Sequence, residues 1–349
     1  MLAVAGSVAF FLSAAGLPFV IARVVAETGG RLSVEGASGS LASTMHFERL
    51  EWHGSETTVT AREVVVEWRA LALFSRRLAI RGLGAREIAI AVKPSAGATA
   101  PPASLALPLA VTMDHVAVSE LDWQAGPRTG KITGLEFGYE GDAIVHRIRG
   151  LRFVHEAGAL SGDATLQATA PFALEGGVAI VGDGPLAGAK LGTTLSGTLP
   201  EIAVDATGTM RAAALTAHID VTPFAGNAFR AAAITLDNVD LAAFHAALPR
   251  TRLKLDLDAR PREGGATGTF RAVNGEAGSI DDERLPVAAA AGRYDFATAV
   301  LALSDLDVTL AGGAHASGDG RVDLAAADAA SRWRLAVRDL DLARQVASG

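Results

Sequence analysis

Residues 31–92 read RLSVEGASGSLASTMHFERLEWHGSETTVTAREVVVEWRALALFSRRLAIRGLGAREIAIAV, and this stretch decides the fold. Its short apolar runs alternate with polar residues, and Gly-rich or polar turns separate the runs. Side chains on a strand point alternately to the two faces of a sheet, so a period of two predicts strands with one apolar and one polar face. The stretch therefore predicts an extended, one-sided apolar β surface.

Three runs in this stretch, EVVVEW, LAI and EIAIAV, show the alternation most clearly. LKLDLD repeats it farther along the chain, where leucines alternate with Lys254, Asp256 and Asp258. The candidates for an apolar groove are Val64, Val66, Trp68, Leu78, Ile80, Ile88, Ile90, Val92, Leu253, Leu255 and Leu257. Most stripes of this kind form the packed core of a sandwich or barrel, so that alternative stays open.

The composition favours a mainly β protein with few helices. The chain has 349 residues, of which 50% are hydrophobic and only 5% aromatic. Its 38 glycines favour many turns and bulges in a strand-rich chain. The mean hydropathy of +0.29 is high for a soluble protein. This length allows one elongated β structure.

Charge and residue types exclude several function classes. A net charge of −7 offers no basic field for nucleic acid. The chain has no cysteine, which excludes disulfides, thiolate metal sites and a cysteine nucleophile. No nucleophile elbow, Walker loop or dinucleotide fingerprint is present. We therefore expect neither an enzyme nor a cofactor or metal site.

The N-terminal segment from Leu2 to Ala22 carries no charge. About 20 apolar residues cross a bilayer core of about 30 Å as a helix, so we expect a retained single-pass anchor. A cleaved signal peptide, with small residues at 13–16 as its cleavage site, is the first alternative, and a buried core helix is the second. The candidate anchor residues are Leu2, Phe10, Phe11, Leu12, Leu17, Phe19 and Ile21.

Composition also predicts the domain organisation. We expect the anchor or signal segment at 1–25, an N-terminal β unit at 26–93, a Pro/Ala-rich linker or loop at 94–104, and continuing strands at 105–349. Asp240 can cap a short helix over Leu241–Leu248, which Pro249 would end.

Weak internal repeats point to stacked β units. GLRFVHEAGALSGDATL, from Gly150, resembles DLDVTLAGGAHASGDGRV, from Asp305. Each phrase predicts a strand, a glycine-containing turn, and a Ser-Gly-Asp sequence that opens the next strand. A shorter pair, NVDLAAF from Asn238 and DLDLARQ from Asp339, repeats in the same way. Repeated strand units of this kind predict an array in which each unit mainly contacts its neighbours.

A few polar residues have a chemical alternative. His315 in GGAHASGDG suggests either a turn histidine or a metal or catalytic loop, and we favour the turn. Asp256 and Asp258 fit the solvated face of a strand better than paired acid–base carboxylates. Residues 281–283 (DDE) lack the ligand pattern of a calcium loop and predict an exposed turn.

The order of several phrases resembles a known family. GRLSVEGASGSLASTMHFERLEW, VVVEWRALAL and LAIRGLGAREIAI follow the apolar N-terminal segment, and LPLAVTMDHVAVSELDW and LDNVDLAAFHAALP come later. In this order they resemble the N-terminal part of TamB, the inner-membrane subunit of the translocation and assembly module, which belongs with the AsmA-like proteins. The resemblance covers most of the chain, although each phrase alone is degenerate.

The resemblance implies a repeating β-groove: a long curled (β-taco-like) sheet with an apolar interior, held at the inner membrane of a Gram-negative bacterium and lying in the periplasm. Such proteins are thought to carry phospholipids, by their acyl chains, toward the outer membrane and to act with an Omp85-type barrel partner. Members are far longer than this chain, so we expect a fragment or a short relative.

Two other functions stay open. A scaffold for autotransporter-type outer-membrane protein assembly and secretion would pack the same stripes internally. A β-helical carbohydrate enzyme would need a carboxylate cluster, and Asp256 and Asp258 lack neighbouring aromatic platforms.

Overall fold

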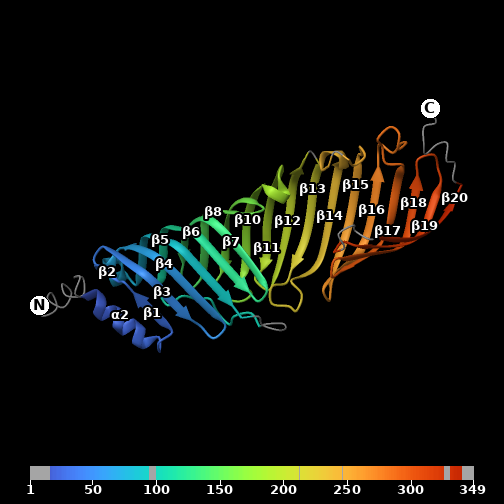
Figure 1. The fold of residues 1–349 in the computed structure, drawn as a ribbon. Coiled ribbons are helices and arrows are strands. Elements are labelled where there is room, and N and C mark those ends of the chain that lie inside the picture. Colours follow the sequence, from blue (N-terminus) through green and yellow to red (C-terminus); the bar gives the residue numbers. More distant parts are fainter. Residues whose placement is uncertain (1–15, 94–99, 212, 246, 326–330, 340–349) are drawn as a thin grey trace, which may run out of the picture. The chain divides into compact units, whose positions relative to one another are not determined.

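The computed structural model describes residues 16–93, 100–211, 213–245, 247–325 and 331–339. These residues form mainly strands, as the alternation predicts, with one helix and three short 3-10 turns (Figure 1). The chain divides into two compact units. The first contains Met1–Gly97 and Pro101–Pro185, and the second contains Leu186–Gly349 with Ala98–Ala100.

The first unit contains the helix, the first ten strands and the 3-10 turn η1. Consecutive strands from β2 to β10 pair antiparallel, except that β5 and β6 are parallel, and β1 pairs with β3. The elements are α2 Gly16–Glu27, β1 Leu32–Glu35, β2 Ser38–Gly39, β3 Thr44–His53, β4 Thr57–Trp68, η1 Ala70–Ser75, β5 Arg77–Val92, β6 Ala110–Ala125, β7 Arg128–Gly141, β8 Val145–His155, β9 Gly158–Gln167 and β10 Ala173–Gly182.

The parallel pair β5–β6 explains the Pro/Ala-rich segment between them. Arg77 pairs with Ala110 and Val92 pairs with Ala125, so residues 93–109 join opposite ends of the pair. That distance is about 50 Å at about 3.3 Å per residue, so a parallel pairing of these two strands requires a long connection. Its last residues are tied to strand ends, because the Leu105 amide donates to the Ala168 carbonyl at 2.8 Å.

The two faces of the first sheet differ in polarity along whole rows of paired residues. One inner row runs Met45, Val66, Leu83, Val116 and Phe137. The next rows on this face run Val34, Leu50, Ala61, Ile88, Leu121 and Ile132, and Leu32, Trp52, Val59, Ile90 and Trp123. The face is therefore apolar across the strands as well as along them.

The opposite face carries cross-strand ion pairs. Arg62 and Glu87 lie 3.1 Å apart, and further cross-strand pairs join Lys131 with Glu120 and Arg152 with Glu136, whereas Arg49 and Glu51 pair within β3. Exposed pairs of this kind contribute about 0–1 kcal/mol each. Their main consequence is that this face stays in water, so the apolar face must be the one that the curl of the sheet shelters.

The best buried part of the first unit is a cluster of small apolar residues on the inner face. Val64, Ala85, Val116 and Val118 form it, and larger residues such as Phe47 and Phe137 pack around it. Among the described residues, no large side chain is fully buried. The sheet therefore shelters its apolar face without closing over it as a barrel core would.

The second unit is a ten-strand antiparallel meander. Each strand from β11 to β20 pairs with the next one along the chain. Its elements, with the turn η2 before them, are η2 Gly184–Leu186, β11 Ala189–Thr198, β12 Glu201–Met210, β13 Ala213–Val221, β14 Phe229–Val239, η3 Leu241–Ala243, β15 Leu253–Arg262, β16 Gly265–Asn274, β17 Val287–Ala297, β18 Val300–Leu310, β19 His315–Asp323 and β20 Ser331–Arg338.

The repeated phrases form equivalent hairpins with equivalent bulges. Gly150 and Asp305 both have left-handed φ values, 58° and 52°, and the ladder register shifts beside each of them. In the Ser-Gly-Asp sequences, a Cβ at Gly162 would collide with the Gly177 carbonyl oxygen, and one at Gly318 with that of Arg334. A bulge bends its strand and increases the local twist, so the repeat encodes curvature.

The helix predicted over Leu241–Leu248 is wrong in extent. Among the described residues of this stretch, only the 3-10 turn Leu241–Ala243 forms, although Asp240 caps it as expected by accepting a hydrogen bond from the Ala242 amide at 3.1 Å. The Asp240 carboxylate also accepts from the Thr251 amide at 3.1 Å. The cap therefore ties the loop to the next strand, and an isolated segment this short does not propagate a helix.

We expect Val64→Ala to lower the free energy of unfolding by about 2 kcal/mol, because it leaves a cavity in the inner cluster where Val64 is 4% exposed. Urea titration followed by tryptophan fluorescence measures this, since Trp52, Trp68 and Trp123 report on the first unit. Val154→Ala, at an exposed position, is the control and should change the free energy of unfolding by less than about 0.5 kcal/mol. Equal effects would contradict the assignment of the cluster.

His218 on the outer face of the second unit should titrate above its ordinary range. Its Nδ1 lies 2.7 Å from Asp205 Oδ1, and this hydrogen bond raises the pKa of His218, with further help from the Asp205 and Asp220 charges. The stabilisation that this interaction gives the folded state is fully present at pH values below the pKa of His218 in the unfolded chain. It is lost as the pH rises through the pKa of His218 in the folded chain. Asp205→Asn should lower the His218 pKa in an NMR titration, whereas Asp237→Asn should leave it unchanged.

Candidate functional site

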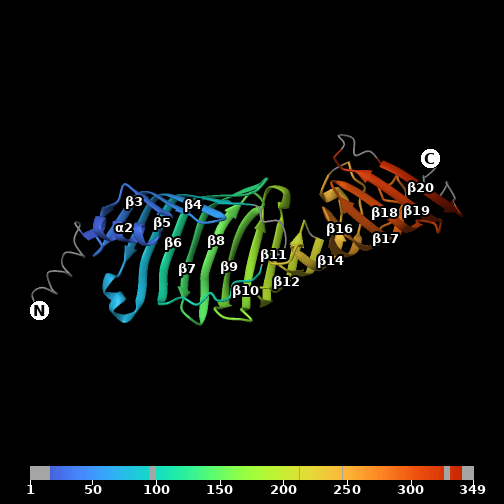
Figure 2. The same cartoon turned by 90° about the horizontal axis from the view of Figure 1, so that it is seen from below.

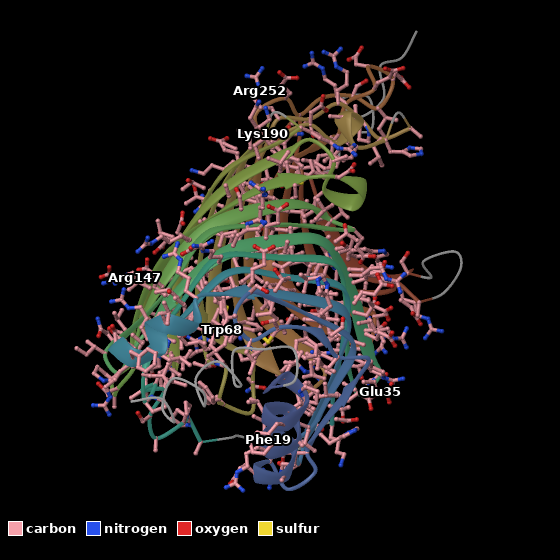
Figure 3. All side chains as sticks on the ribbon, turned by 90° about the vertical axis from the view of Figure 1, so that its left-hand side faces the viewer. Phe19, Glu35, Trp68, Arg147, Lys190 and Arg252 are labelled. Atoms are coloured by element: carbon pink, nitrogen blue, oxygen red, sulfur yellow. The ribbon has the colours of Figure 1, made fainter. Side chains whose placement is uncertain are left out.

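A wholly apolar cavity of about 320 Å³ lies between α2 and the inner face of the first sheet. The helix covers β1, β3, β4 and β5, and Figure 3 shows the first unit's strands arching over α2, with Trp68 inside and Arg147 outside. The lining residues are Leu17, Val20, Ile21, Val24, Leu32, Val34, Leu41, Met45, Phe47, Leu50, Val66, Trp68, Leu78 and Ile80. No titratable side chain lines it, so it suits an apolar ligand and offers no acid or base.

Helical spacing explains why α2 packs here. Leu17, Val20, Ile21 and Val24 follow the i, i+3, i+4, i+7 pattern that places them on one face. Arg23 pairs with Glu27 on the exposed side. The helix ends before Gly29 and Gly30, which both have left-handed φ values.

Only the C-terminal part of the predicted membrane anchor lies within the described residues. Leu17 is 2% exposed and lines the cavity with Ile21, as the core-helix alternative predicts for these residues, whereas Phe19 faces outward. The candidates Leu2, Phe10, Phe11 and Leu12 lie outside the described residues. None of the helices in the described ranges combines the length and apolar character that crossing a bilayer requires.

Trp68, which lines this cavity, carries a polar atom. Its indole Nε1 is buried and has no hydrogen-bond partner. A buried donor without a partner costs free energy. A polar group of a bound molecule that accepted a hydrogen bond from this atom would remove that cost.

The second unit also has an apolar face. One row of paired residues crosses all ten of its strands, and the neighbouring outer row contains Asp205, His218, Asp258 and Arg293. The inner row is Leu195, Val204, Ile219, Ala232, Ala259, Gly268, Tyr294, Leu303, Gly320 and Trp333. With neighbouring strands about 4.8 Å apart, the row extends about 43 Å.

The groove candidates from the sequence lie at four places on the inner faces. Val66, Trp68, Leu78 and Ile80 line the cavity under α2. Val64 lies in the buried cluster and Ile88 packs against it. Ile90 continues an inner row toward the far strand ends, where Val92 is exposed. Leu253, Leu255 and Leu257 are half-buried in β15, in the second unit.

Sequence reasoning missed eight of the fourteen residues that line the cavity. The residues not singled out were Val20, Val24, Leu32, Val34, Leu41, Met45, Phe47 and Leu50. In β3 the alternation breaks at Glu48–Arg49, so Phe47 and Leu50 reach the same face in spite of their odd spacing. A search for alternation that allows one slip would have found this strand.

One polar cluster interrupts the inner face of the first unit. The Tyr139 hydroxyl lies 2.7 Å from His146 Nδ1, and His146 Nε2 lies 3.0 Å from the Leu105 carbonyl oxygen. Burial raises the pKa of Tyr139. These contacts tie the end of the 93–109 connection to β7 and β8.

The polar candidates form no common site. Asp256 accepts from Thr235 Oγ1 at 2.8 Å, and Asp258 from Thr269 Oγ1 at 3.2 Å, both on the outer face of β15. His315 starts β19, and residues 281–283 lie in the turn before β17. In the described part of the chain, no group of His, Asp or Glu side chains could hold a metal ion.

We expect Trp68→Phe to change the free energy of unfolding by less than about 1 kcal/mol, because it removes a donor that has no partner and keeps most of the apolar ring. Trp68→Ala should cost about 3 kcal/mol through the cavity that it leaves. Urea titration followed by circular dichroism compares the two variants. If Trp68→Phe is as destabilising as Trp68→Ala, the indole N–H has a partner after all.

Comparisons with known proteins bear on the first unit. Residues 3–129 match the family model described as TamB, N-terminal domain. Comparison with curated proteins gave no match, and comparison with solved structures gave none either. The match spans α2 and the strands that line the cavity, and it confirms the resemblance stated from the sequence: residues 3–129 are similar to the N-terminal domain of TamB.

Proposed function

We propose that this protein carries phospholipids along its apolar inner face, between the inner membrane and the outer membrane, and so supports outer-membrane biogenesis. The observation that carries the proposal is the set of apolar rows of paired residues, which cross β3 to β6 or β7 in the first unit and all ten strands in the second. Because such a row is apolar from strand to strand, an acyl chain that lies along it makes similar contacts at each successive strand.

Energetics favour a carrier over a tight binder. Burial of one methylene contributes about 0.8 kcal/mol, so a shallow apolar track offsets much of the cost of removing an acyl chain from a membrane. Movement along the track then needs sites of similar affinity rather than one deep pocket. The proposed activity requires no catalytic group, and we propose that the protein is not an enzyme.

The proposed location follows from the family match. We propose that the segment before α2 anchors the chain in the inner membrane by a single pass and that the β units lie in the periplasm. An outer-membrane barrel of the Omp85 type remains the proposed partner, through a region that this chain has not been shown to contain.

A structural adaptor for outer-membrane protein assembly is the second candidate function. The observation that favours it is the edge strand β20, whose eight residues are all exposed and which, among the described residues, pairs with β19 alone. Such an edge can recruit a strand of another protein by β-augmentation. In that case the inner face would contact protein rather than lipid.

A photo-crosslinking experiment in cells separates the two functions. A photoreactive residue at Val66 or Leu255 should give phospholipid adducts, because both side chains point to the inner faces. The matched controls are Glu67 and Lys254, the next residues on the same strands, which are exposed. We expect at least about fivefold more lipid adduct at the inner positions.

Two results would count against lipid carriage. Adducts to protein alone at Val66 and Leu255 would favour the adaptor. Equal lipid adducts at inner and outer positions would show contact with a membrane without use of the groove. Circular dichroism of each variant establishes that the strands are intact.

A further inference from the structure

The loop between β4 and β5 exposes large apolar side chains that the fold does not use. It consists of η1, with the sequence ALALFS, and its Leu71, Leu73 and Phe74 side chains are 68%, 45% and 78% exposed. Figure 2 shows this light-blue loop projecting beyond the strand ends. Single exposed apolar residues are ordinary on protein surfaces, but three within four positions at the tip of one loop form a patch.

Arginines border this loop on both sides. Arg69 precedes η1, and Arg76 and Arg77 follow it. Of these three, only Arg69 has an ion-pair partner among the described residues, and its distance to Asp114 is 3.9 Å between largely exposed groups. We call Arg69, Leu71, Leu73, Phe74, Arg76 and Arg77 the η1 patch. The patch is cationic in a chain whose net charge is −7.

Backbone hydrogen bonds fix the loop. The Arg76 amide donates to the Leu73 carbonyl at 2.9 Å, and the Ala72 amide donates to the Arg69 carbonyl at 3.0 Å. Arg76 itself closes the turn with a left-handed φ of 54°. The Ala110 amide, at the start of β6, donates to the Arg76 carbonyl at 3.3 Å. The apolar tip is therefore presented in a defined conformation.

The η1 patch and the first residues of α2 lie toward the same end of the strands. The His53 amide donates to the Arg31 carbonyl, so the chain leaves α2 at the His53 end of β3. The η1 turn follows Trp68, next to Thr44 at the opposite end of β3, because Thr44 pairs with Glu67. Figure 1 shows α2 alongside β1 and β3. The helix therefore starts toward the end that carries the patch.

We propose that the η1 patch inserts into the surface of a bilayer that contains anionic phospholipids. Leu71, Leu73 and Phe74 would enter the boundary between headgroups and acyl chains, while the arginines would contact lipid phosphates. Each basic residue near an anionic surface strengthens such binding, and an apolar tip alone binds weakly. The contact would also bring Trp68 and Leu78, at the same strand ends, close to the lipid interface.

This proposal does not depend on whether lipid fills the groove. A groove that carries no lipid would leave the surface contact intact, and a loop that stays in water would leave the groove unaffected. The crosslinking experiment above and the labelling experiment below therefore fail separately.

The test uses the full chain, which contains no cysteine, so one introduced thiol carries the only label. Ser75→Cys places an environment-sensitive fluorophore beside Phe74 without removing any patch residue. With vesicles of 30% phosphatidylglycerol in phosphatidylcholine, we expect its emission to shift to the blue. Ser55→Cys is the matched control, because Ser55 is an exposed serine in the turn at the other end of β4 and its label should stay aqueous.

The arginine contribution is measured in the same assay. In the Ser75→Cys background, Arg76→Gln with Arg77→Gln should weaken the vesicle titration at least fivefold, and vesicles of phosphatidylcholine alone should weaken it similarly. Replacement of Leu71, Leu73 and Phe74 by Ser should abolish the shift at residue 75.

Three results would overturn the proposal. One is a label at residue 75 that stays aqueous in the anionic vesicles. Another is an equal shift at residue 55, which would indicate non-specific adsorption. The third is a blue shift that appears without vesicles and depends on protein concentration, which would show that a second copy of the chain covers the patch.

Discussion

The structure depends on strands that pair with their neighbours while one face of each is apolar. In the described part of the chain no second sheet covers that face, and α2 covers it only over β1, β3, β4 and β5. Backbone hydrogen bonds hold the strands together, but they leave the apolar rows to be sheltered by curvature. The bulges at Gly150 and Asp305 therefore matter as much as the ladder itself, because they bend the strands that carry those rows.

This constraint also explains the chemistry of the two faces. Charged residues collect outside, where ion pairs such as Arg62 with Glu87 cost nothing in desolvation and contribute little to stability. The inside is nearly free of charge, so it offers aliphatic contact without acid–base groups. A surface of this kind suits the shielding of an acyl chain, and the cavity under α2 is its best enclosed part. Exposed apolar residues at η1 are a separate feature, because they lie beyond the sheet.

Strand positions were predictable where alternation was strict. EVVVEW and EIAIAV became parts of β4 and β5, with Val64, Val66, Trp68, Ile88 and Ile90 on the inner face. The prediction weakened where the alternation slips by one residue, as at Glu48–Arg49, because one slip moves every following residue to the other face. The helix expected at Leu241–Leu248 failed for another reason. Its cap formed, but the cap is shared with Thr251 in the next connection, and local signals do not record that tertiary contact.

The sequence by itself determined the strand-rich class, the polarity of the two faces and the resemblance that the family match confirms over residues 3–129. These properties are local, because a period of two and a turn residue act within a few positions of the chain. Only the tertiary structure decided that β5 and β6 run parallel, that α2 packs on the sheet to enclose a cavity, and that η1 and the start of α2 point to the same strand ends. Those features join residues far apart in sequence, and pairing partners and packing across such distances are set by the whole fold.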